Sequence, residues 1–203
     1  MKETFEQNKL IAGIDCQRCH GPAAEHVDYH TKHPTEKEAH AIQKVRGLSR
    51  QQQLDMCALC HSGLKPMLQP AFRFKPGDAL ADFLMPTAPF PAKSMDVHGN
   101  QYQLLSASKC FSGSQQMTCG SCHNTHTNER DNMQVFSQRC MSCHAAGSPD
   151  FCTLKNVPAA TLQQNCIDCH MPAMPSSAIT LLTNGQQSPT PDSIRTHLIA
   201  IYK

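Results

Sequence analysis

The sequence contains one short pattern, Cys-x-x-Cys-His, five times in 203 residues. Two thiols separated by two residues can form thioether bonds with the two vinyl groups on one edge of a haem, and the adjacent histidine then lies beneath the iron as its proximal ligand. The other ring nitrogen of that histidine is free to donate a hydrogen bond to a backbone carbonyl, which fixes the ring. The pattern therefore predicts five covalently bound haem c groups. The predicted attachment cysteines are Cys16, Cys19, Cys57, Cys60, Cys119, Cys122, Cys140, Cys143, Cys166 and Cys169, and the predicted proximal ligands are His20, His61, His123, His144 and His170.

Zinc binding is the main alternative interpretation of this pattern. Zinc ribbons also use Cys-x-x-Cys knuckles, but they need them in pairs and have no reason to place a histidine after every second cysteine. Five knuckles cannot be divided into pairs. A thioredoxin-like dithiol would occur once, within a βαβ unit that this sequence lacks. The repeated pattern therefore favours haem over zinc or a redox dithiol.

The composition offers little material for an ordinary hydrophobic core. Only 5% of the residues are aromatic, there is no Trp, and 14 prolines accompany a mean hydropathy of −0.43. We expect the porphyrins to fill the interior, so that folding depends on haem attachment. The predicted fold class is mainly α with extensive irregular loops, in which short helices wrap around a covalent five-haem stack. The spacing of the motifs indicates no linker, so we expect a single domain over residues 1–203.

Charge and hydropathy argue against nucleic-acid binding and against a membrane-spanning segment. The net charge of +2 and a pI near 8.0 give no basic excess that would indicate nucleic-acid binding. No run of 18 apolar residues exists, so the sequence predicts no transmembrane segment. Residues 1–15 show no apolar stretch typical of an export signal. Covalent haem nevertheless predicts a periplasmic or extracellular location.

Two capping boxes mark helix starts in the first third of the chain. Thr35-Glu-Lys-Glu38 predicts a helix that Gly47 ends. Ser49-Gln-Gln-Gln52 predicts a second helix, which leads into the motif at Cys57.

The stretch between residues 66 and 91 contains six prolines. Proline removes a backbone donor and disfavours both helix interiors and central strands. We predict irregular structure there, apart from a short strand at Phe72-Arg-Phe74.

Seven histidines lie outside the motifs and are candidates for the second axial ligand of the irons. A second histidine would close the coordination sphere and make a low-potential electron carrier, whereas a methionine would raise the potential. The seven are His26, His30, His33, His40, His98, His126 and His197. We interpret His33 and His40, which lie among Lys and Glu, as surface residues. We predict the other five as distal ligands, with an ordinary surface or hydrogen-bonded role as the alternative for each.

Spacing constrains three of these histidines. His26 and His30 are four residues apart and share a face if residues 23–33 form a helix. His126 follows His123 by three residues, too few to wrap around a haem, so we expect it to serve a neighbouring haem. Among the ten methionines, Met171 and Met174 are the candidate ligands, although packing is the commoner role.

Two cysteines, Cys110 and Cys152, belong to no motif. In an exported protein they are expected to form a disulfide. The alternative is two unrelated buried thiols.

Three runs, namely Cys16–His26, Cys110–His126 and Cys166–Pro172, resemble bacterial multihaem c-type cytochromes related to the nitrifiers' tetrahaem cytochrome and to hydroxylamine oxidoreductase. The similarity spans nearly the whole chain, and its most specific parts are Cys-His-Gly-Pro-x-x-x-His and Cys-x-x-Cys-His-x-x-His. The resemblance implies closely packed haem pairs, mostly bis-histidine irons, export before haem attachment, and His26 and His126 as distal ligands. It is also compatible with a C-terminal pentahaem part of a longer protein. One iron would then lack a ligand, or one histidine would serve a haem bound elsewhere.

Motifs and resemblance together predict electron transfer between redox proteins or other multihaem cytochromes. The alternative is an oxidoreductase that acts on a small nitrogen or sulfur compound at one five-coordinate haem. Multihaem nitrite reductases place a lysine in the motif of their catalytic haem, and none of the five motifs does so. Hydroxylamine oxidoreductases crosslink a tyrosine to theirs, and Tyr29 is the tyrosine beside a haem segment. No acid–base constellation stands out, so we predict no catalytic residue and favour the carrier. A structural role for the haems in an oligomer or larger complex stays open.

Overall fold

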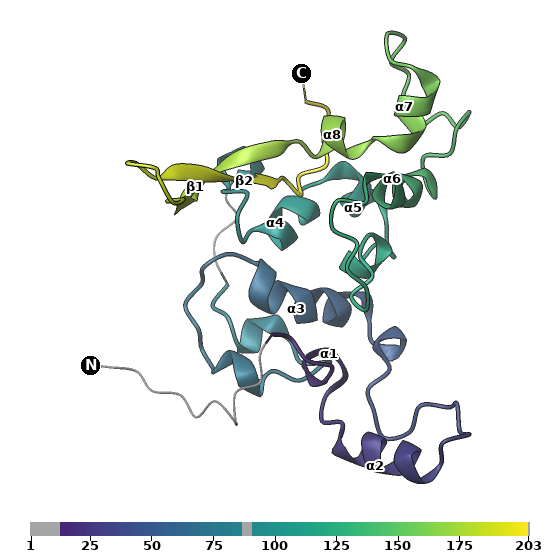
Figure 1. Cartoon of the computed structure of the whole chain (residues 1–203). Coiled ribbons are helices and arrows are strands. Elements are labelled where there is room, and N and C mark those ends of the chain that lie inside the picture. The colour runs from purple at the N-terminus through teal and green to yellow at the C-terminus, as the bar shows by residue number, and fades with distance from the viewer. Residues whose placement is uncertain (1–12, 87–90, 203) are drawn as a thin grey trace.

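The computed structural model describes residues 13–86 and 91–202 (Figure 1). The described chain is mostly helical with long loops, and it contains one small two-stranded sheet. The α-helices are α1 (Gln17–His20), α2 (Ala24–Lys32), α3 (Arg50–His61), α4 (Gln101–Ser106), α5 (Lys109–Gly113), α6 (Met133–Met141), α7 (Ala159–Gln164) and α8 (Ile167–His170). The 3-10 turns are η2 (Val45–Gly47), η3 (Ala71–Arg73), η4 (Leu80–Asp82), η5 (Ala92–Ser94) and η6 (Cys119–Ser121). The strands β1 (Ala173–Leu181) and β2 (Thr190–Arg195) pair antiparallel.

The longest helix, α3, begins at the second predicted capping box. The Ser49 hydroxyl accepts from the Gln52 amide at 3.3 Å, and the Gln52 side chain accepts from the Ser49 amide at 3.0 Å, so two otherwise unpaired donors are satisfied. Leu54 and Ala58 lie on its buried face. The predicted helix is confirmed.

The helix predicted from residue 35 is wrong. Between α2 and the short turn η2 the backbone is extended or bends, because its polar groups have other partners. The Glu36 carboxylate accepts from the amides of Lys37 and Glu38 at 2.9 and 3.0 Å, an alternative to helical bonding. The carbonyls of His40 and Gln43 accept hydrogen bonds from two histidine rings. The segment therefore positions histidines instead of forming a helix.

The proline-rich stretch is irregular in its described part, as predicted, but the short strand at residues 72–74 is wrong. Pro70 opens the turn η3, in which the Arg73 amide donates to the Pro70 carbonyl at 2.9 Å. Phe72 is exposed, whereas Phe74 is buried against Phe83. Residues 87–90, which contain one of the six prolines, lie outside the described residues.

Within residues 13–86 and 91–202 the apolar core consists of two small clusters on either side of α3. One contains Leu59, Phe74, Phe83 and Leu84, and the other contains Leu54, Leu105 and Phe111. The accessible surface of the chain is 14879 Å². A compact monomer of this mass would expose roughly 9,400 Å². The polypeptide alone therefore buries much less surface than a typical globular protein, in agreement with its composition.

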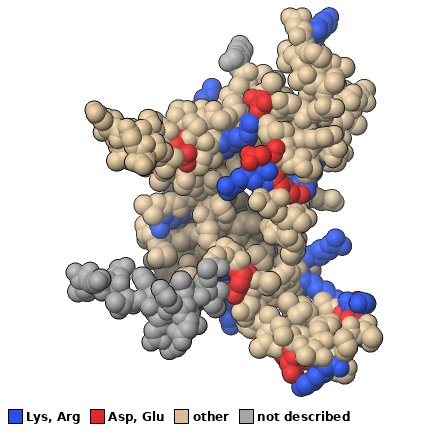
Figure 2. All heavy atoms as spheres, in the orientation of Figure 1, with Lys and Arg blue, Asp and Glu red and all other residues tan. Residues whose placement is uncertain are grey.

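Two parts of the chain project from this centre in opposite directions (Figure 1). The α2 lobe, which we define as residues 22–44, lies at one end beyond α1. The β1–β2 hairpin lies at the other end, beside α8. Figure 2 shows Lys, Arg, Asp and Glu gathered on the α2 lobe, whereas the hairpin is almost free of them. Within the described ranges no helix is long and apolar enough to cross a membrane.

Candidate functional site

All five Cys-x-x-Cys-His motifs occupy helical turns. They lie on α1, at the end of α3, on η6, at the end of α6 and on α8. In the first, third, fourth and fifth motifs the histidine amide donates to the carbonyl of the first cysteine at 2.9–3.1 Å. Residues i, i+3 and i+4 of a helical turn share one face. The motif spacing thereby places both thiols and the imidazole on the same side of the chain.

Backbone carbonyls hold three of the five motif histidines. The Nδ1 atoms of His20, His144 and His170 lie 2.9, 2.8 and 2.9 Å from the carbonyl oxygens of Gln43, Asp150 and Ala200. A carbonyl only accepts, so each Nδ1 carries the proton and each Nε2 keeps a free lone pair for a metal. This is the orientation that the sequence predicted for a proximal ligand.

Two motif histidines face a histidine from elsewhere in the chain. The ring centres of His20 and His126 are 6.0 Å apart, and those of His123 and His197 are also 6.0 Å apart. Two imidazoles that bind one metal through nitrogens at about 2 Å leave their ring centres roughly 6 Å apart. Both pairs therefore fit an iron between them. His126 lies opposite His20 and not opposite its sequence neighbour His123.

In the His123–His197 pair, His197 is half-buried and His123 keeps part of its side chain exposed. Burial, and next the nearby His123, lowers the pKa of His197 to about 4. Burial also lowers the pKa of His123, and the positive charge of Arg139 is the next cause of this decrease. The Nδ1 atom of His197 is buried without a hydrogen-bond partner. Both shifts favour the neutral ring, which is the form that binds metals.

The cysteines of the first three motifs adjoin one another in sequence order. Burial raises the pKa of Cys19, and the Cys57 thiol of the second motif adds to the rise. A hydrogen bond from Cys57 to Cys119 of the third motif raises the pKa of Cys57 and lowers that of Cys119. Motif 1 therefore adjoins motif 2, and motif 2 adjoins motif 3.

The series continues through the last two motifs. Burial raises the pKa of Cys122, and Cys143 of the fourth motif contributes to the rise. Burial raises the pKa of Cys140 to about 12, with Cys166 of the fifth motif as the next cause. Thiols of consecutive motifs thus lie near enough to influence one another, from motif 1 through to motif 5.

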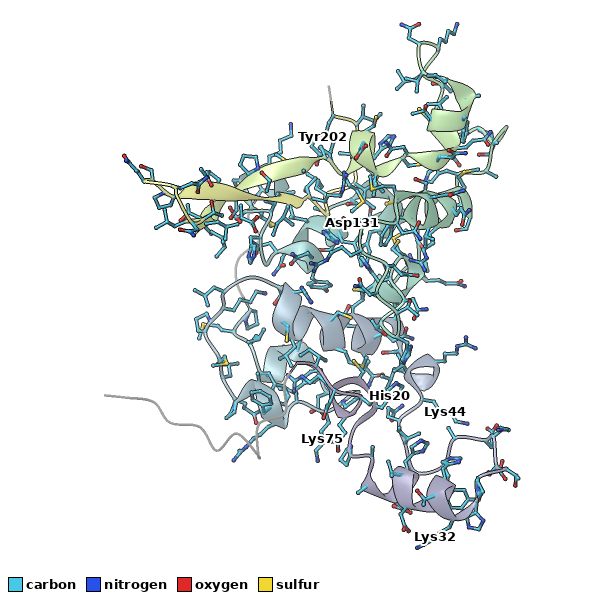
Figure 3. All side chains as sticks on the ribbon, in the orientation of Figure 1. His20, Lys32, Lys44, Lys75, Asp131 and Tyr202 are labelled. Atoms are coloured by element: carbon cyan, nitrogen blue, oxygen red, sulfur yellow. The ribbon has the colours of Figure 1, made fainter. Side chains whose placement is uncertain are left out.

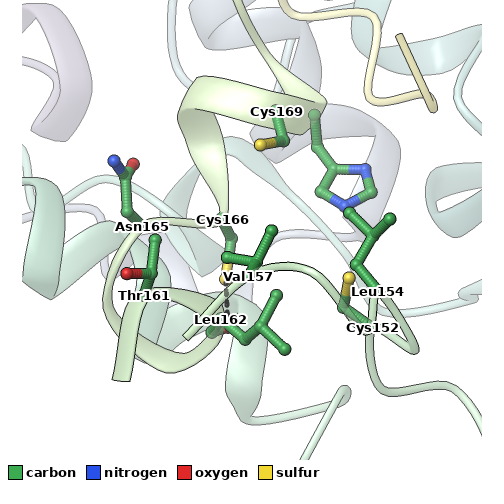
Figure 4. A pocket seen from close by; sticks show the side chains of 9 residues that line it. Cys152, Leu154, Val157, Thr161, Leu162, Asn165, Cys166 and Cys169 are labelled. Atoms are coloured by element: carbon green, nitrogen blue, oxygen red, sulfur yellow. Dashed lines mark hydrogen bonds between the residues drawn. The ribbon is translucent and has the colours of Figure 1, made fainter. Parts of the chain in front are cut away.

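The fifth motif borders a mainly apolar pocket (Figure 4). Leu154, Val157 and Leu162 line it together with Cys166 and Cys169. The Cys166 thiol points to the Leu162 carbonyl at 3.7 Å. Apolar side chains next to the two attachment thiols provide a surface that suits one face of a porphyrin.

The predicted disulfide between Cys110 and Cys152 is absent, and both residues are free thiols. Cys110 lies on α5, where it raises the pKa of Cys122. Cys152 lines the pocket at the fifth motif. Cys110 adjoins thiols of the third and fourth motifs and Cys152 adjoins the fifth, and the two are not bonded to each other.

The remaining predicted distal ligands are dispersed. His26 and His30 share a face of α2, which confirms the predicted helix, and their ring centres are 4.6 Å apart. His98 is half-buried on the loop after η5, where its amide donates to Asp96 at 2.8 Å. Met174 is exposed on β1, and Met171 ends α8. Their roles as ligands stay predictions.

Sequence reasoning missed the ion pairs that support the motifs. The Arg139 guanidinium binds both oxygens of Glu129 at 2.6 and 2.5 Å and donates to the Cys122 carbonyl at 2.7 Å. Arg195 binds Asp168, which lies inside the fifth motif, at 2.6 Å. The position of Arg139 directly before Cys140 was the available signal, but its partner lies on another loop.

Comparison of the chain with known protein families, curated proteins and solved structures found no match. Among the described residues no three His, Cys, Asp or Glu side chains converge as they do at a tetrahedral zinc site. The two-histidine pairs and the five attachment turns are therefore the features from which a function has to be derived.

Proposed function

We propose that the chain carries five covalently bound haems and transfers electrons along them between redox partner proteins. The observation that carries the proposal is the row of motifs, in which the cysteines of each motif adjoin those of the next. Haems attached to adjoining cysteines have neighbouring porphyrin edges. A continuous row of this kind is what electron passage from one end to the other requires.

The residues present fit haem c. Each motif presents two thiols and an imidazole on one side of a helical turn, and carbonyl acceptors leave the Nε2 atoms of three proximal histidines free. His126 and His197 lie where a second axial ligand would bind, opposite His20 and His123. Iron held between two imidazoles exchanges one electron without making or breaking a ligand bond. Haem of this kind is attached outside the cytoplasm, so we propose a periplasmic or extracellular location.

The two ends of the row differ in charge, which bears on the partners. Motif 1 adjoins the α2 lobe with its exposed charges, and motif 5 adjoins the hairpin, which bears few charges and whose Arg195 is paired with Asp168 of the motif (Figures 1 and 2). Figure 3 labels His20 between the lobe that bears Lys32 and the opposite part that bears Tyr202. Interactions between exposed charges weaken with salt. We expect electron exchange at the motif 1 end to depend on ionic strength more than exchange at the motif 5 end.

The proposal is tested by producing the chain with an export signal and a haem-attachment system. The mass should increase by five haems over the 22.4 kDa polypeptide. A reduced small-molecule donor should then reduce all five irons, and an oxidised cytochrome should reoxidise them without another product. Four or fewer haems after full maturation would contradict the proposal. The matched control replaces Cys110 and Cys152 by Ser, which should leave the haem content unchanged.

One observation favours the alternative, an oxidoreductase acting on a small nitrogen or sulfur compound at an open iron. His144 of the fourth motif is exposed. Of the seven histidines outside the motifs, four lie on the α2 lobe at the other end of the molecule and two face His20 and His123. The irons of motifs 2, 4 and 5 thus have no facing histidine among these six, and of their proximal histidines His61 and His144 are exposed, so an open iron would be that of motif 2 or motif 4. A high-spin iron that binds nitrite or hydroxylamine and turns it over with a reductant would establish this alternative.

A further inference from the structure

The proximal histidine of motif 3 is not oriented in the way that three other proximal histidines are. Backbone carbonyls accept from the Nδ1 atoms of His20, His144 and His170. Within residues 13–86 and 91–202, no carbonyl accepts from Nδ1 of His123. An axial imidazole nevertheless needs a fixed orientation. Other contacts therefore have to orient His123.

Helix α6 contacts both the ring of His123 and the peptide group before it. The Phe136 ring packs edge-on against the His123 ring, with ring centres 5.5 Å apart and planes at 62°. Arg139 lies three residues further along the same helix face and donates to the Cys122 carbonyl at 2.7 Å. This carbonyl belongs to the peptide that joins Cys122 to His123. One face of α6 therefore holds the ring and the backbone on its N-terminal side.

The Glu129 carboxylate holds the peptide group on the other side of His123. Its Oε2 atom accepts from the Asn124 amide at 3.1 Å, and the Arg139 guanidinium binds both carboxylate oxygens at 2.6 and 2.5 Å. Bidentate pairs of this kind fix geometry as well as contributing energy. Only 25% of the Arg139 side chain and 17% of the Glu129 side chain are exposed. A single shielded ion pair therefore holds both peptides that flank a proximal ligand.

The same ion pair anchors the turn that carries His126. The Asn124 side chain accepts from the His126 amide at 3.1 Å, and the Asn124 carbonyl accepts from the Thr127 amide at 3.3 Å. Residues 123–132 belong to no helix or strand, so these bonds set the path of the loop. Asn124 is itself held by Glu129. The position of His126 opposite His20, with ring centres 6.0 Å apart, thus depends on the ion pair.

A role in stability alone does not account for the groups that the pair contacts. An ion pair that only links two segments needs no bonds to particular backbone groups. The side chains of Lys44 and Glu38 on the α2 lobe, for example, bond to each other and not to the backbone of the described residues. Arg139 and Glu129 instead direct their remaining donor and acceptor atoms to the two peptides beside His123.

We infer that Glu129 and Arg139 are positioning residues for two axial ligands on two different irons. These ligands are His123, which is proximal in motif 3, and His126, which faces His20 of motif 1. The inference rests on the proposed function and adds the residues that keep two of its irons fully ligated. Because one ion pair supports both ligands, a change in it should affect these two irons and leave those of motifs 2, 4 and 5 as they are.

The test compares the complete five-haem protein with its Glu129→Gln and Arg139→Lys variants. Glutamine offers one acceptor oxygen in place of two, and lysine keeps the charge but loses the planar fork. Both variants should shift the low-spin electron paramagnetic resonance signals of two irons. Such signals depend on the angle between the two imidazole planes, which is 30° for His20 with His126 and 25° for His123 with His197.

A second measurement is cyanide binding at the motif 1 iron. Cyanide should bind there at least ~10-fold more tightly in both variants, because His126 leaves the iron more often. The signals of the two irons are identified with His126→Ala and His197→Ala. Glu38→Gln, which removes the exposed ion pair on the lobe, is the matched control and should leave every signal and the cyanide affinity unchanged.

Three results would overturn the inference. A lower melting temperature in both variants with five unchanged iron signals would limit the ion pair to stability. Wild-type behaviour of Arg139→Lys would show that the charge, and not the fork geometry, is what counts. Changes at all five irons would indicate a general loosening of the fold. Haem content, measured on the same samples, tests the proposed function separately, since fewer than five haems in the wild type would count against that proposal whatever the variants do.

Discussion

Two groups of histidines in this molecule have different surroundings and therefore different chemistry. His123 and His197 face each other in the centre, where partial burial lowers the pKa of both rings and their spacing fits one iron. His33 and His40 are exposed on the α2 lobe and pack around Tyr29. The comparison teaches that the number of histidines in a sequence does not give the number of ligands. The opposed ring at 6.0 Å, with the lowered pKa of both its members, distinguishes the central pair from the lobe histidines.

The two regions also differ in what stabilises them. The centre contains the apolar clusters and the five attachment turns. Within the lobe, exposed ion pairs such as Lys32–Asp28 and Lys44–Glu38, both at 2.7 Å, link neighbouring residues. Exposed pairs of this kind contribute little to stability. Changes at the centre should therefore have larger effects than the corresponding changes on the lobe.

The largest expected effect is the loss of the whole fold without haem. The polypeptide has two small apolar clusters and exposes far more surface than a compact protein of its size. Its apolar burial is therefore too small to offset the chain entropy lost on folding. The apoprotein should show a largely disordered circular dichroism spectrum and no cooperative thermal transition. A stable, cooperatively melting apoprotein would show that the polypeptide has a sufficient core of its own.

The second-largest expected effect is a change of spin state at a single iron. His197→Ala removes the ring that faces His123, so the iron there loses one strong-field ligand. One of the five irons should become high-spin and bind cyanide, as measured by electron paramagnetic resonance and optical titration. His33→Ala on the lobe is the matched control and should leave all signals unchanged. Equal spectra for the two variants would remove the distinction between the two groups of histidines.

Part of the fold was predictable because the signal was local. The capping box at residues 49–52 and the α3 helix are confirmed, since both partners of the box lie within one turn. The similar pattern at residues 35–38 failed because Glu36 bonds to the two following amides and the carbonyls of His40 and Gln43 bind rings from other segments. A local sequence pattern does not reveal hydrogen-bond partners from distant segments that replace the bonds of a helix.

The same limit applies to the candidate site. The attachment turns follow from the motif spacing alone, because residues i, i+3 and i+4 share a face. The partner of each proximal histidine could not be read from the sequence, since His20 and His126, like His123 and His197, are brought together by the path of the whole chain. The disulfide between Cys110 and Cys152 failed for a related reason. An even number of leftover cysteines says nothing about where each one lies.

A smaller effect on melting temperature should distinguish the Glu129–Arg139 ion pair in the centre from an exposed ion pair on the lobe. The Arg139 guanidinium, and then the Asn124 amide, lower the pKa of Glu129 to about 2 from an ordinary value of 4.5. A carboxyl with a lowered pKa stabilises the fold above its unfolded pKa, and this contribution is lost as the pH falls from about 4.5 towards 2. Glu129→Gln should therefore lower the melting temperature of the haem protein at pH 7, and the difference from the wild type should shrink across this range.

The matched control for this change is Glu38→Gln on the lobe. Glu38 pairs with Lys44 at 2.7 Å, but its side chain is 83% exposed, so the pair should contribute almost nothing. Its melting temperature should follow that of the wild type at every pH. A loss of stability in Glu38→Gln as large as in Glu129→Gln would show that the lobe is as firmly supported as the centre.

The smallest effect concerns the two cysteines outside the motifs. In the proposed five-haem protein the ten motif thiols would be consumed by attachment, whereas Cys110 and Cys152 would stay free. Alkylation of the denatured five-haem protein without a reductant should therefore label these two thiols, as peptide mapping would show. In the folded protein Cys110 should react slowly at neutral pH, because burial raises its pKa and the thiolate is the reactive form. The Cys110→Ser variant should keep a single label on Cys152. Labelling that appears only after reduction would restore the disulfide and require α5 and the loop at Cys152 to lie together.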